Sequence, residues 1–303
     1  MKLRGARILI EELIRQGVDT VFGYPGGAVL NIYDELYQCR DRIHHVLTAH
    51  EQGAAHAADG FARASGKVGV VIATSGPGAT NLVTGIANAY LDSVPLVAIT
   101  GNVATEALGR DSFQEVDIVS ITQPVVKHNF MVKDVSELEQ TIKEAFLIAN
   151  SGRKGPVLID IPKDVQVNEC EYGVAVLPRM PEKAELPYDE ESVVQLLNAA
   201  KKPFIYVGGG IVSAGGEDYL RELAEKLNAP VAVSMMGRTA FPDSHPLSLG
   251  LVGMHGSYQA AKVQSECDLM IAVGVRFSDR ATGNLSRYTK NCKVIHVDID
   301  KAE

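Results

Sequence analysis

Short apolar segments alternate with segments of helical periodicity in the first half of the chain. The mainly apolar segments predict strands, at 19–23, 43–48, 68–74, 94–100 and 155–162. The helical segments lie between them, at the N-terminus up to Gly17 and at 28–38, 51–65, 79–91 and 136–150. Strands that are apolar throughout, each joined to the next by a helix, indicate a parallel sheet with helices on both faces.

The alternation stops at 164–187, which contains three prolines and mixed charges without a helical period. It resumes with helices predicted at 189–200, 217–227 and 257–265 and strands at 203–207, 230–235, 268–275 and 293–300. We therefore expect an α/β chain of two consecutive doubly wound parallel-sheet domains, 1–163 and 188–303, joined by a linker at 164–187. The second domain is expected to be Rossmann-like and cut short at its C-terminus, because no covering helix follows the last predicted strand.

Composition narrows the classes of partner. The chain carries 29 basic and 37 acidic side chains, a net charge of −8, without a long basic block, which disfavours nucleic acid and anionic membranes. No apolar run approaches the roughly 18 residues of a membrane span. Its four cysteines are scattered without a C-x-x-C pair, so we expect reduced thiols, a cytoplasmic protein and no metal site within these residues.

Candidate chemistry lies where the predicted strands end. Four segments fall there: GYPGG at 23–27, AHE at 49–51, TSGPGATN at 74–81 and TGN at 100–102. Ligands of doubly wound sheets bind at this edge. Glu51 is either an ordinary acidic residue of a first helical turn or a carboxylate facing a ligand, and its glycine-rich neighbours favour the ligand. Neither a Walker loop nor a G-x-S-x-G nucleophile motif is present, and GGGIVSAGG at 208–216 departs from strict G-x-G-x-x-G.

Longer stretches carry a family resemblance. The segments GYPGGAVLNIYDEL, TAHEQGAAHAADGFARASG, TSGPGATN, DSFQEVDIV, VVKHNF, GPVLIDIPKDV, GMHG and VGVRFSDR occur in this order along the chain. Together they resemble the large catalytic subunits of acetohydroxyacid synthase (acetolactate synthase), which are thiamine-diphosphate enzymes. The resemblance implies decarboxylation of pyruvate and its joining to a second 2-ketoacid, either pyruvate or 2-ketobutyrate. The product is 2-acetolactate or 2-aceto-2-hydroxybutyrate, for the biosynthesis of isoleucine, valine and leucine.

The resemblance also assigns roles in the first domain, the pyrimidine-binding domain. Glu51 is implied to contact N1′ of the cofactor's aminopyrimidine and to share a proton with it, so that the cofactor can form its carbanion. Further positions follow by motif: Tyr24, Pro77 and Asn81 around the aminopyrimidine, Gly27 and Gln114 at the reacting centre, and Phe113 and Lys163 along the substrate channel. For Pro77 a rigid turn, and for Lys163 a solvated surface charge, remain alternatives.

In the second domain the resemblance implies FAD, bound without redox turnover. The matching positions are Arg153, Gly208, Gly209, Gly210, Ser234, Gly274, Arg276 and Asp298, while Met254 and Arg280 match positions that face the active site. Ser278 departs from the family pattern, which usually has aspartate there.

The resemblance also bears on assembly. Only the aminopyrimidine half of the thiamine site is expected in this chain, because the G-D-G…N-N motif that holds the diphosphate through Mg²⁺ is absent. A homodimer through the pyrimidine-binding domain and a small regulatory subunit are the implied protein partners. The 303 residues alone are therefore expected to be inactive. Two alternatives stay open: another thiamine-dependent carboligase or decarboxylase, and a non-catalytic piece that lacks the diphosphate and magnesium domain.

Overall fold

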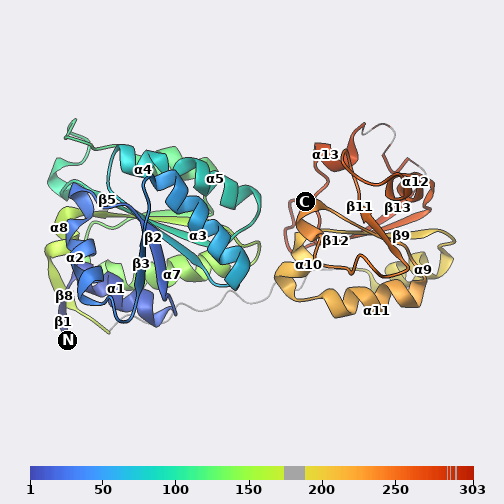
Figure 1. Ribbon diagram of the computed structural model, residues 1–303, viewed down its shortest axis with the longest axis horizontal. Helices are drawn as coiled ribbons and strands as arrows, with labels where there is room; N and C mark the ends of the chain where they lie inside the picture. The colour runs from blue at the N-terminus through green and yellow to red at the C-terminus, as the bar shows by residue number, and fades with distance from the viewer. Residues whose placement is uncertain (174–187, 285, 287, 291) are drawn as a thin grey trace. The chain divides into compact units, whose positions relative to one another are not determined.

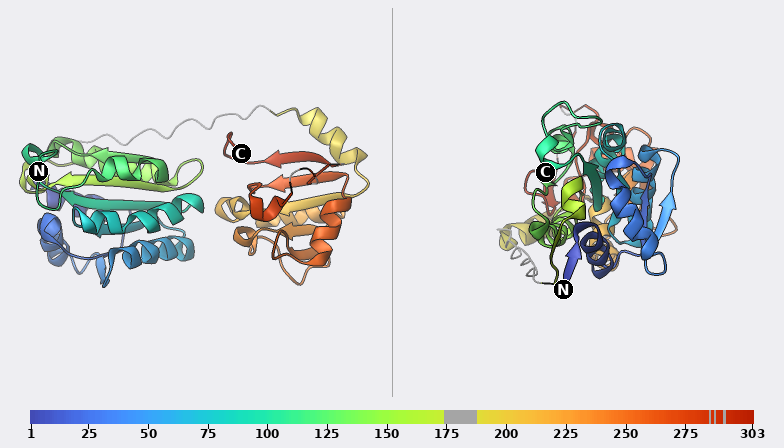
Figure 2. Two further views of the ribbon diagram at one scale, coloured as in Figure 1. Left: turned by 90° about the horizontal axis from the view of Figure 1, so that it is seen from above. Right: turned by 90° about the vertical axis from the view of Figure 1, so that its left-hand side faces the viewer.

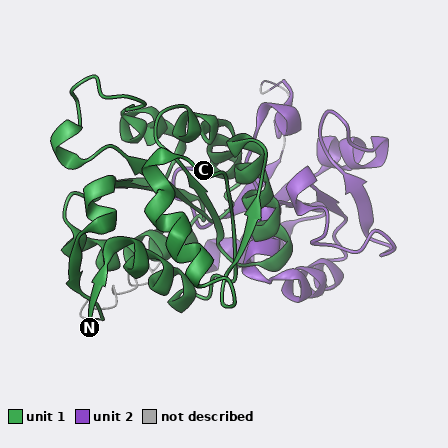
Figure 3. Cartoon of the chain, turned by 60° about the vertical axis from the view of Figure 1, so that its left-hand side comes forward, with its two compact units in different colours: residues 1–182 green, residues 183–303 purple. Residues whose placement is uncertain are grey.

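The computed structural model describes residues 1–173, 188–284, 286, 288–290 and 292–303. The chain divides into two compact units, Met1–Glu182 and Lys183–Glu303 (Figure 3). Each unit is an α/β domain built on a parallel sheet, which confirms the predicted fold class.

The first unit is built on a six-stranded parallel sheet in the order β3-β2-β4-β5-β7-β6 (Figure 1). Its strands are β3 (His44–Leu47), β2 (Thr20–Gly23), β4 (Gly69–Ala73), β5 (Leu96–Asn102), β7 (Pro156–Pro162) and β6 (His128–Met131). Strands β4, β5 and β7 are buried along their whole length. Five of the strands were predicted, whereas the edge strand β6 was missed because its sequence HNFM begins with two polar residues and is nowhere fully buried.

Alternate residues of these strands point into two separate cores. Val70, Ile72, Val97 and Ile99 pack with α1 (Gly5–Arg15), α2 (Leu30–Gln38) and α7 (Val135–Asn150). Val71, Ala73, Leu96 and Ala98 pack with α3 (Glu51–Ser65) and α5 (Val83–Leu91). Figure 2 shows helices on both sides of the sheet from two further directions. Because successive side chains of a strand point to opposite faces of the sheet, a strand that is buried along its whole length needs a helical layer on each face.

Short elements occupy the connections of the first unit. They are η1 (Gly27–Val29), α4 (Pro77–Asn81), η2 (Thr105–Ala107), α6 (Ile118–Thr122), η3 (Gln123–Val125) and α8 (Lys163–Val167). The helix predicted at 79–91 is thus two helices, α4 and α5, separated at Leu82.

The segment predicted as a linker begins later than the sequence suggested. Helix α8 buries Val165 and Gln166, and strand β8 (Glu169–Glu171) pairs antiparallel with β1 (Lys2–Arg4). The three prolines that suggested a linker all follow this strand. The predicted linker therefore began too early in the sequence. The remainder of the predicted linker, 174–187, lies outside the described residues.

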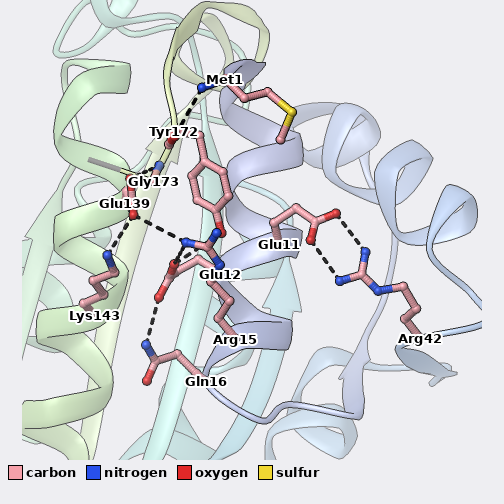
Figure 4. Close-up of polar contacts among 10 residues, drawn as sticks. All are labelled: Met1, Glu11, Glu12, Arg15, Gln16, Arg42, Glu139, Lys143, Tyr172 and Gly173. Carbon is pink, nitrogen blue, oxygen red and sulfur yellow. Dashed lines mark hydrogen bonds and ion pairs between the residues drawn. The ribbon is translucent and has the colours of Figure 1, made fainter. Parts of the chain in front are cut away.

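A buried charge network holds β8 against helices α1 and α7 (Figure 4). Glu139 accepts hydrogen bonds from Lys143 Nζ at 2.7 Å and from the Gly173 backbone N–H at 2.8 Å. The Arg15 guanidinium approaches Glu139 at 3.9 Å and lies 4.4 Å from the centroid of the Tyr172 ring. Because both Glu139 and Lys143 are buried, their mutual pairing offsets a large desolvation cost, and it fixes where the chain leaves the first unit.

The second unit has a five-stranded parallel sheet in the order β11-β10-β9-β12-β13. The strands are β11 (Ser248–Leu251), β10 (Val231–Val233), β9 (Pro203–Val207), β12 (Leu269–Val273) and β13 (Lys293–Val297). Numbered along the chain this is 3-2-1-4-5, the order typical of dinucleotide-binding folds. Strand β11 was not predicted, since its half-buried sequence SLGL lacks a continuous apolar run.

Helices again cover both faces of this sheet. One core combines Ile205, Val207 and Val231 with α9 (Glu190–Ala199), α10 (Gly209–Ala214) and α11 (Glu217–Leu227). The other combines Phe204 and Tyr206 with α12 (Tyr258–Glu266) and α13 (Asp279–Thr282). A 3₁₀ turn, η4 (Met235–Gly237), follows β10. Among the described residues no helix is both long and apolar enough to cross a membrane.

One carboxylate is fully buried inside the first sheet. Asp160 of β7 is 0% exposed, and it accepts hydrogen bonds from Thr100 Oγ1 at 2.7 Å and Asn102 Nδ2 at 2.6 Å, both on β5. Burial raises the pKa of Asp160 to about 7, against the lowering effect of these two donors, and the negative charges of Asp117 and Glu115 add to the increase.

The raised pKa predicts a pH-dependent stability. An unfolded aspartate has a pKa of about 3.9, so between roughly pH 4 and pH 7 the folded chain holds a proton that the unfolded chain has released. Stability from this group is complete below that window and is lost as pH rises through 7. Asp160→Asn removes this titration. As pH rises from 5 to 8, the melting temperature of the wild type should therefore fall relative to that of Asp160→Asn.

Asp134→Asn is the matched control for this experiment. Asp134 is an exposed helix cap that accepts hydrogen bonds from Ser136, and its pKa is lowered by the Ser136 backbone bond. Its titration therefore lies below pH 5, and its difference from the wild type should stay flat across the same range. A flat difference for Asp160→Asn as well would contradict the prediction.

Candidate functional site

The first sheet reverses its strand order between β2 and β4. The chain proceeds outward from β2 to β3 and then returns to β4 on the other side of β2. The loops that follow β2 and β4 consequently run in opposite directions at the carboxyl edge, and doubly wound folds bind ligands at such a switch point. Glu51 follows β3 at the same edge, and its hydrogen bond with Asn81, which follows β4, brings it to this switch point.

Glu51 is a buried carboxylate at the first position of α3. Only 9% of the Glu51 surface is exposed to solvent. The preceding residue, His50, caps the helix, since its Nδ1 accepts the Gln52 backbone N–H at 3.0 Å. Asn81, the last residue of α4, donates from Nδ2 to Glu51 Oε2 at 2.9 Å. The structure therefore brings together two of the predicted residues and orients the carboxylate through one of its oxygens.

A buried hydroxyl lies near this carboxylate and was not predicted. Among the described residues, the Tyr33 hydroxyl is buried and has no hydrogen-bond partner. Burial, and then the charge of Glu51, raise the pKa of Tyr33, so the hydroxyl keeps its proton. Tyr33 belongs to the helical pattern of α2, where an aromatic residue looks like ordinary core, and no signal in the sequence distinguished it.

The loop after β2 presents backbone groups to the same edge. The Ala28 N–H donates to Thr74 Oγ1 at 3.1 Å, which ties this loop to the end of β4. Gly27 begins the 3₁₀ turn η1, so its N–H has no acceptor within the turn and, on an exposed residue, is available to a ligand. Tyr24 is also exposed at the start of this loop.

Gln114 approaches the glycine turn before α4. Gly76 has a φ of 58°, and a Cβ added there would lie 2.6 Å from the Gln114 carbonyl oxygen. Gln114 itself has a φ of 55°, which is unusual for a residue with a side chain. The backbone conformations of these two residues thus permit the loop after β5 to rest on the turn that leads to Asn81.

Phe113 and Lys163 are both exposed near this edge. Phe113 is 85% exposed, and Lys163 begins α8 directly after β7. Arg153 is the exception among the predicted residues of this unit. It precedes β7, at the opposite edge of the sheet, where its Nε donates to Ser93 Oγ at 2.9 Å and its guanidinium lies 5.9 Å from the Tyr90 ring centroid.

The predicted residues of the second unit also gather at strand ends. Gly208, Gly209 and Gly210 follow β9, Ser234 follows β10, Gly274 and Arg276 follow β12, and Asp298 follows β13. Strands β9 and β12 flank the point where the strand order reverses. All of these residues therefore lie at the edge where a dinucleotide would bind.

Part of this glycine pattern serves the packing of the chain itself. The Gly210 N–H donates to the Gly274 carbonyl at 2.9 Å, and a Cβ on Gly208 would lie 2.1 Å from that carbonyl oxygen. Gly274 has a φ of 54°. Glycine is required at these positions because the two strand-end turns touch, whether or not a ligand is bound.

The remaining predicted residues of this unit have polar neighbours of their own. Asp298 is half-buried, and its Oδ1 accepts the Asp300 N–H at 2.8 Å. Met254 and Arg280 lie together, since the Met254 N–H donates to the Arg280 carbonyl at 2.9 Å and Arg280 Nη1 reaches Met254 Sδ at 3.5 Å. In the part of the chain that the structure describes, no group of three or more His, Cys, Asp or Glu residues could hold a metal ion.

Comparison with known proteins bears on what this arrangement does. Residues 3–121 match the family model of the thiamine pyrophosphate enzyme N-terminal TPP binding domain. Residues 191–303 match the model of the central domain of thiamine pyrophosphate enzymes. The two matches fall in the two units of the structure.

Three curated relatives show the extent of the similarity. The acetolactate synthase isozyme 3 large subunit of Escherichia coli is 51% identical over 98% of this chain and 53% of its own length. An acetolactate synthase of Arthrospira platensis is 51% identical over 100% of this chain and 54% of its own. An acetolactate synthase large subunit of Parasynechococcus marenigrum is 50% identical over 99% and 50%. The chain spans about half the length of the curated relatives it matches.

The contact between Gly76 and Gln114 yields a prediction. Gly76→Ala places a Cβ against the Gln114 carbonyl in addition to straining the backbone, and strain of this kind costs about 1–3 kcal/mol. We expect a larger loss of thermal stability than strain alone produces. Hydrogen exchange at 112–116 should also be faster, because the loop must move away from the turn.

Gly283→Ala controls for the strain. Gly283 has nearly the same backbone angles, φ 58° and ψ −120° against φ 58° and ψ −122° at Gly76, but its Cβ would meet open space. Suppose that Gly76→Ala destabilises the first unit no more than Gly283→Ala destabilises the second, and that hydrogen exchange at 112–116 is unchanged. The Gly76–Gln114 contact would then be unimportant.

Proposed function

The chain belongs to the thiamine pyrophosphate enzymes, within the family of acetolactate synthase large subunits, and from this premise we propose that its gene product makes acetolactate. In the proposed reaction, pyruvate loses carbon dioxide and its remaining two-carbon unit is joined to a second 2-ketoacid, pyruvate or 2-ketobutyrate. The observation that carries this proposal is the buried Glu51 carboxylate, held by Asn81 at the switch point of the first sheet.

The residues around Glu51 fit the aminopyrimidine of thiamine diphosphate. A Cβ on Gly78 would lie 3.3 Å from Glu51 Oε1, so glycine there keeps the second carboxylate oxygen accessible. Asn81 occupies the other oxygen. When bound, thiamine diphosphate supplies a nucleophilic carbon and an electron sink for decarboxylation. Tyr24 and Pro77, at the ends of β2 and β4, would flank the ring.

Glu51 would hold and exchange a proton at its free oxygen. The Asn81 amide fixes the plane of the carboxylate, and the burial of Glu51 excludes water that would compete for the proton. A positioned carboxylate of this kind acts as a general acid–base group. The neighbouring Tyr33 hydroxyl, which keeps its own proton, would donate a hydrogen bond within the same pocket.

Gly27 and Gln114 would act on the substrate. The free N–H of Gly27 and the side-chain amide of Gln114 are donors from the loops after β2 and β5, the two strands that flank β4, and both suit a keto oxygen that gains negative charge. Lys163 offers a cation to a 2-ketoacid carboxylate, and the exposed Phe113 offers an apolar wall for its methyl group. For Met254 and Arg280 of the second unit, the proposed role rests on family resemblance alone: a guanidinium such as that of Arg280 suits the carboxylate of the second 2-ketoacid.

We propose FAD for the second unit, in a structural role. Asp298, half-buried at the end of β13, suits ribose hydroxyls, as acidic residues at strand ends do in dinucleotide-binding folds. Ser234, Arg276 and the Gly209 N–H would supply further donors at the same edge, whereas the N–H groups of Gly208 and Gly210 already bond to the carbonyls of Val273 and Gly274. Arg153 belongs to this proposal by family resemblance alone.

The remaining proposals concern assembly. By family resemblance alone, Mg²⁺ would hold the diphosphate of the cofactor in near-octahedral oxygen coordination, with ligands from a domain other than the two described here. A homodimer through the first unit, and a small regulatory subunit, would complete the enzyme.

Glu51→Gln tests the proton-transfer role. In the full gene product saturated with thiamine diphosphate and Mg²⁺, the amide cannot exchange the proton, so acetolactate formation should fall by about a hundredfold or more. Glu137→Gln is the matched control, since Glu137 is likewise in the first turn of a helix but exposed. Near-normal turnover of Glu51→Gln would exclude the role. Assaying the wild type with other 2-ketoacids separates acetolactate synthesis from related carboligation or decarboxylation.

The division of the cofactor site gives a second test. The 303-residue chain alone should show little or no binding of thiamine diphosphate with Mg²⁺ in calorimetry, and no acetolactate from pyruvate, because its described residues provide for only one end of the cofactor. Binding at micromolar cofactor, or measurable acetolactate, would contradict this. Flavin absorbance after addition of FAD reports separately on the second unit.

A further inference from the structure

Two side chains of α8, directly after β7, make hydrogen bonds to the two loops of the Glu51 site that carry Gly27 and Gln114. These side chains are Asp164 and Gln166, and a third, Asp160 of β7, bonds to the last residues of β5, from which the second loop begins. We propose that they are positioning residues, which hold the loop at 26–28 and the loop at 103–117 in the arrangement needed for catalysis. The catalytic part of this inference rests on the proposed function, whereas its structural part does not.

Asp160 fixes the point where the chain leaves β5. Its two oxygens accept hydrogen bonds from Thr100 and Asn102, within the buried edge of the sheet. Asn102 in turn accepts the Val103 N–H at its Oδ1, at 2.8 Å. The buried carboxylate thus fixes the rotamer of Asn102, and Asn102 sets the direction of the first peptide of the 103–117 loop.

Asp164 holds the same loop two residues further along. Its Oδ1 accepts the Thr105 N–H at 3.0 Å, and its Oδ2 accepts the Thr105 hydroxyl at 2.6 Å. This one carboxylate therefore accepts both the backbone N–H and the side-chain hydroxyl of Thr105, the first residue of η2. The loop is therefore attached to the end of β7 at two successive places.

Bonds inside the loop transmit this attachment to Gln114. Ser112 Oγ donates to the Ala107 carbonyl at 2.7 Å, and the Gly109 N–H donates to Glu115 Oε1 at 2.8 Å. The loop is thus closed on itself between η2 and the residues around Gln114, which rests on Gly76. A displacement at Thr105 would accordingly move Gln114.

Gln166 attaches the other loop. Its Nε2 donates to the Ala28 carbonyl at 2.7 Å and to the Ile161 carbonyl at 2.9 Å, and the residue is 1% exposed. The N–H of the same Ala28 is bound by Thr74. Both sides of Ala28, the neighbour of Gly27, are therefore fixed, one by β4 and one by the segment after β7.

The common origin of the three contacts gives them their significance. Gln114 and Gly27 lie far apart in the sequence, yet the loops that carry them are both held by contacts with the same seven consecutive residues, 160–166. This segment also includes Lys163. Misplacement of a catalytic group by about 1 Å can reduce turnover a hundredfold. Because one segment holds both loops, the groups proposed to face the substrate keep fixed positions relative to one another and to the sheet.

Asp164 allows the sharpest experiment because it is only partly buried. In the full gene product, Asp164→Ala removes both acceptors, and we expect kcat for acetolactate formation to fall by roughly tenfold to a hundredfold. The KM for pyruvate should change less than threefold. Asp164→Asn keeps an oxygen for the Thr105 N–H and an amide that can donate to the Thr105 hydroxyl, so it should recover most of kcat.

Gln166→Glu provides an independent variant. A carboxylate of the same size cannot donate to the Ala28 and Ile161 carbonyls, so exchange should become faster at 26–29, and kcat should again fall more than KM changes. Asp189→Ala is the control, since it removes an exposed capping aspartate of the second unit, at the start of α9, and it should leave kcat and exchange at both loops unchanged.

Hydrogen exchange separates the two hypotheses. Faster exchange at 103–115 in Asp164→Ala, restored in Asp164→Asn, supports the positioning role even if the wild type makes no acetolactate, in which case the proposed function alone fails. Wild-type kcat in both Asp164→Ala and Gln166→Glu overturns the catalytic part of the inference. Unchanged exchange at both loops overturns the structural part.

Discussion

The hydrogen bond from Asn81 to Glu51 joins two segments that the sheet would otherwise keep apart. Glu51 follows β3 and Asn81 follows β4, on opposite sides of β2. A buried carboxylate without a partner would be costly, so its position at the start of α3 depends on this amide. The turn at 74–78, the loop that rests on Gly76 and the loop tied to Thr74 are all arranged around the pair.

Much of this arrangement follows from the sequence, because apolar strands and glycine turns leave strong patterns. The edge of the sheet, the carboxylate and the strand-end loops were all predicted from residues 23–27, 49–51, 74–81 and 100–102. The missed features have physical reasons. Strands β6 and β11 are short and half-buried, and β8 takes its identity from pairing with β1, a partner some 170 residues away.

The positioning residues were harder to predict for a different reason. Asp160 is visible in the sequence as a single charge within the apolar run VLIDIP, and a charge in a buried strand is a signal that it has partners. The identity of its partners, Thr100 and Asn102, follows from the pairing of β5 with β7, which places Thr100 opposite Asp160. The sequence alone does not show this pairing. Gln166 and Tyr33 give no such signal, since their roles arise only from tertiary contacts.

The two units use their switch points differently, although both rest on the same topology. In the second unit Gly208, Gly210 and Gly274 pack directly on one another, so glycine is explained by the chain itself and the case for a ligand depends on Asp298 and its neighbours. In the first unit the polar side chains of Glu51, Asn102 and Asp160 are buried near the corresponding edge of the sheet. The raised pKa of Asp160 shows that its burial is unfavourable for the charged form, and a sheet designed for stability alone would have an apolar residue there. The carboxylate is better explained by the direction it gives to Asn102 and to the loop that carries Gln114.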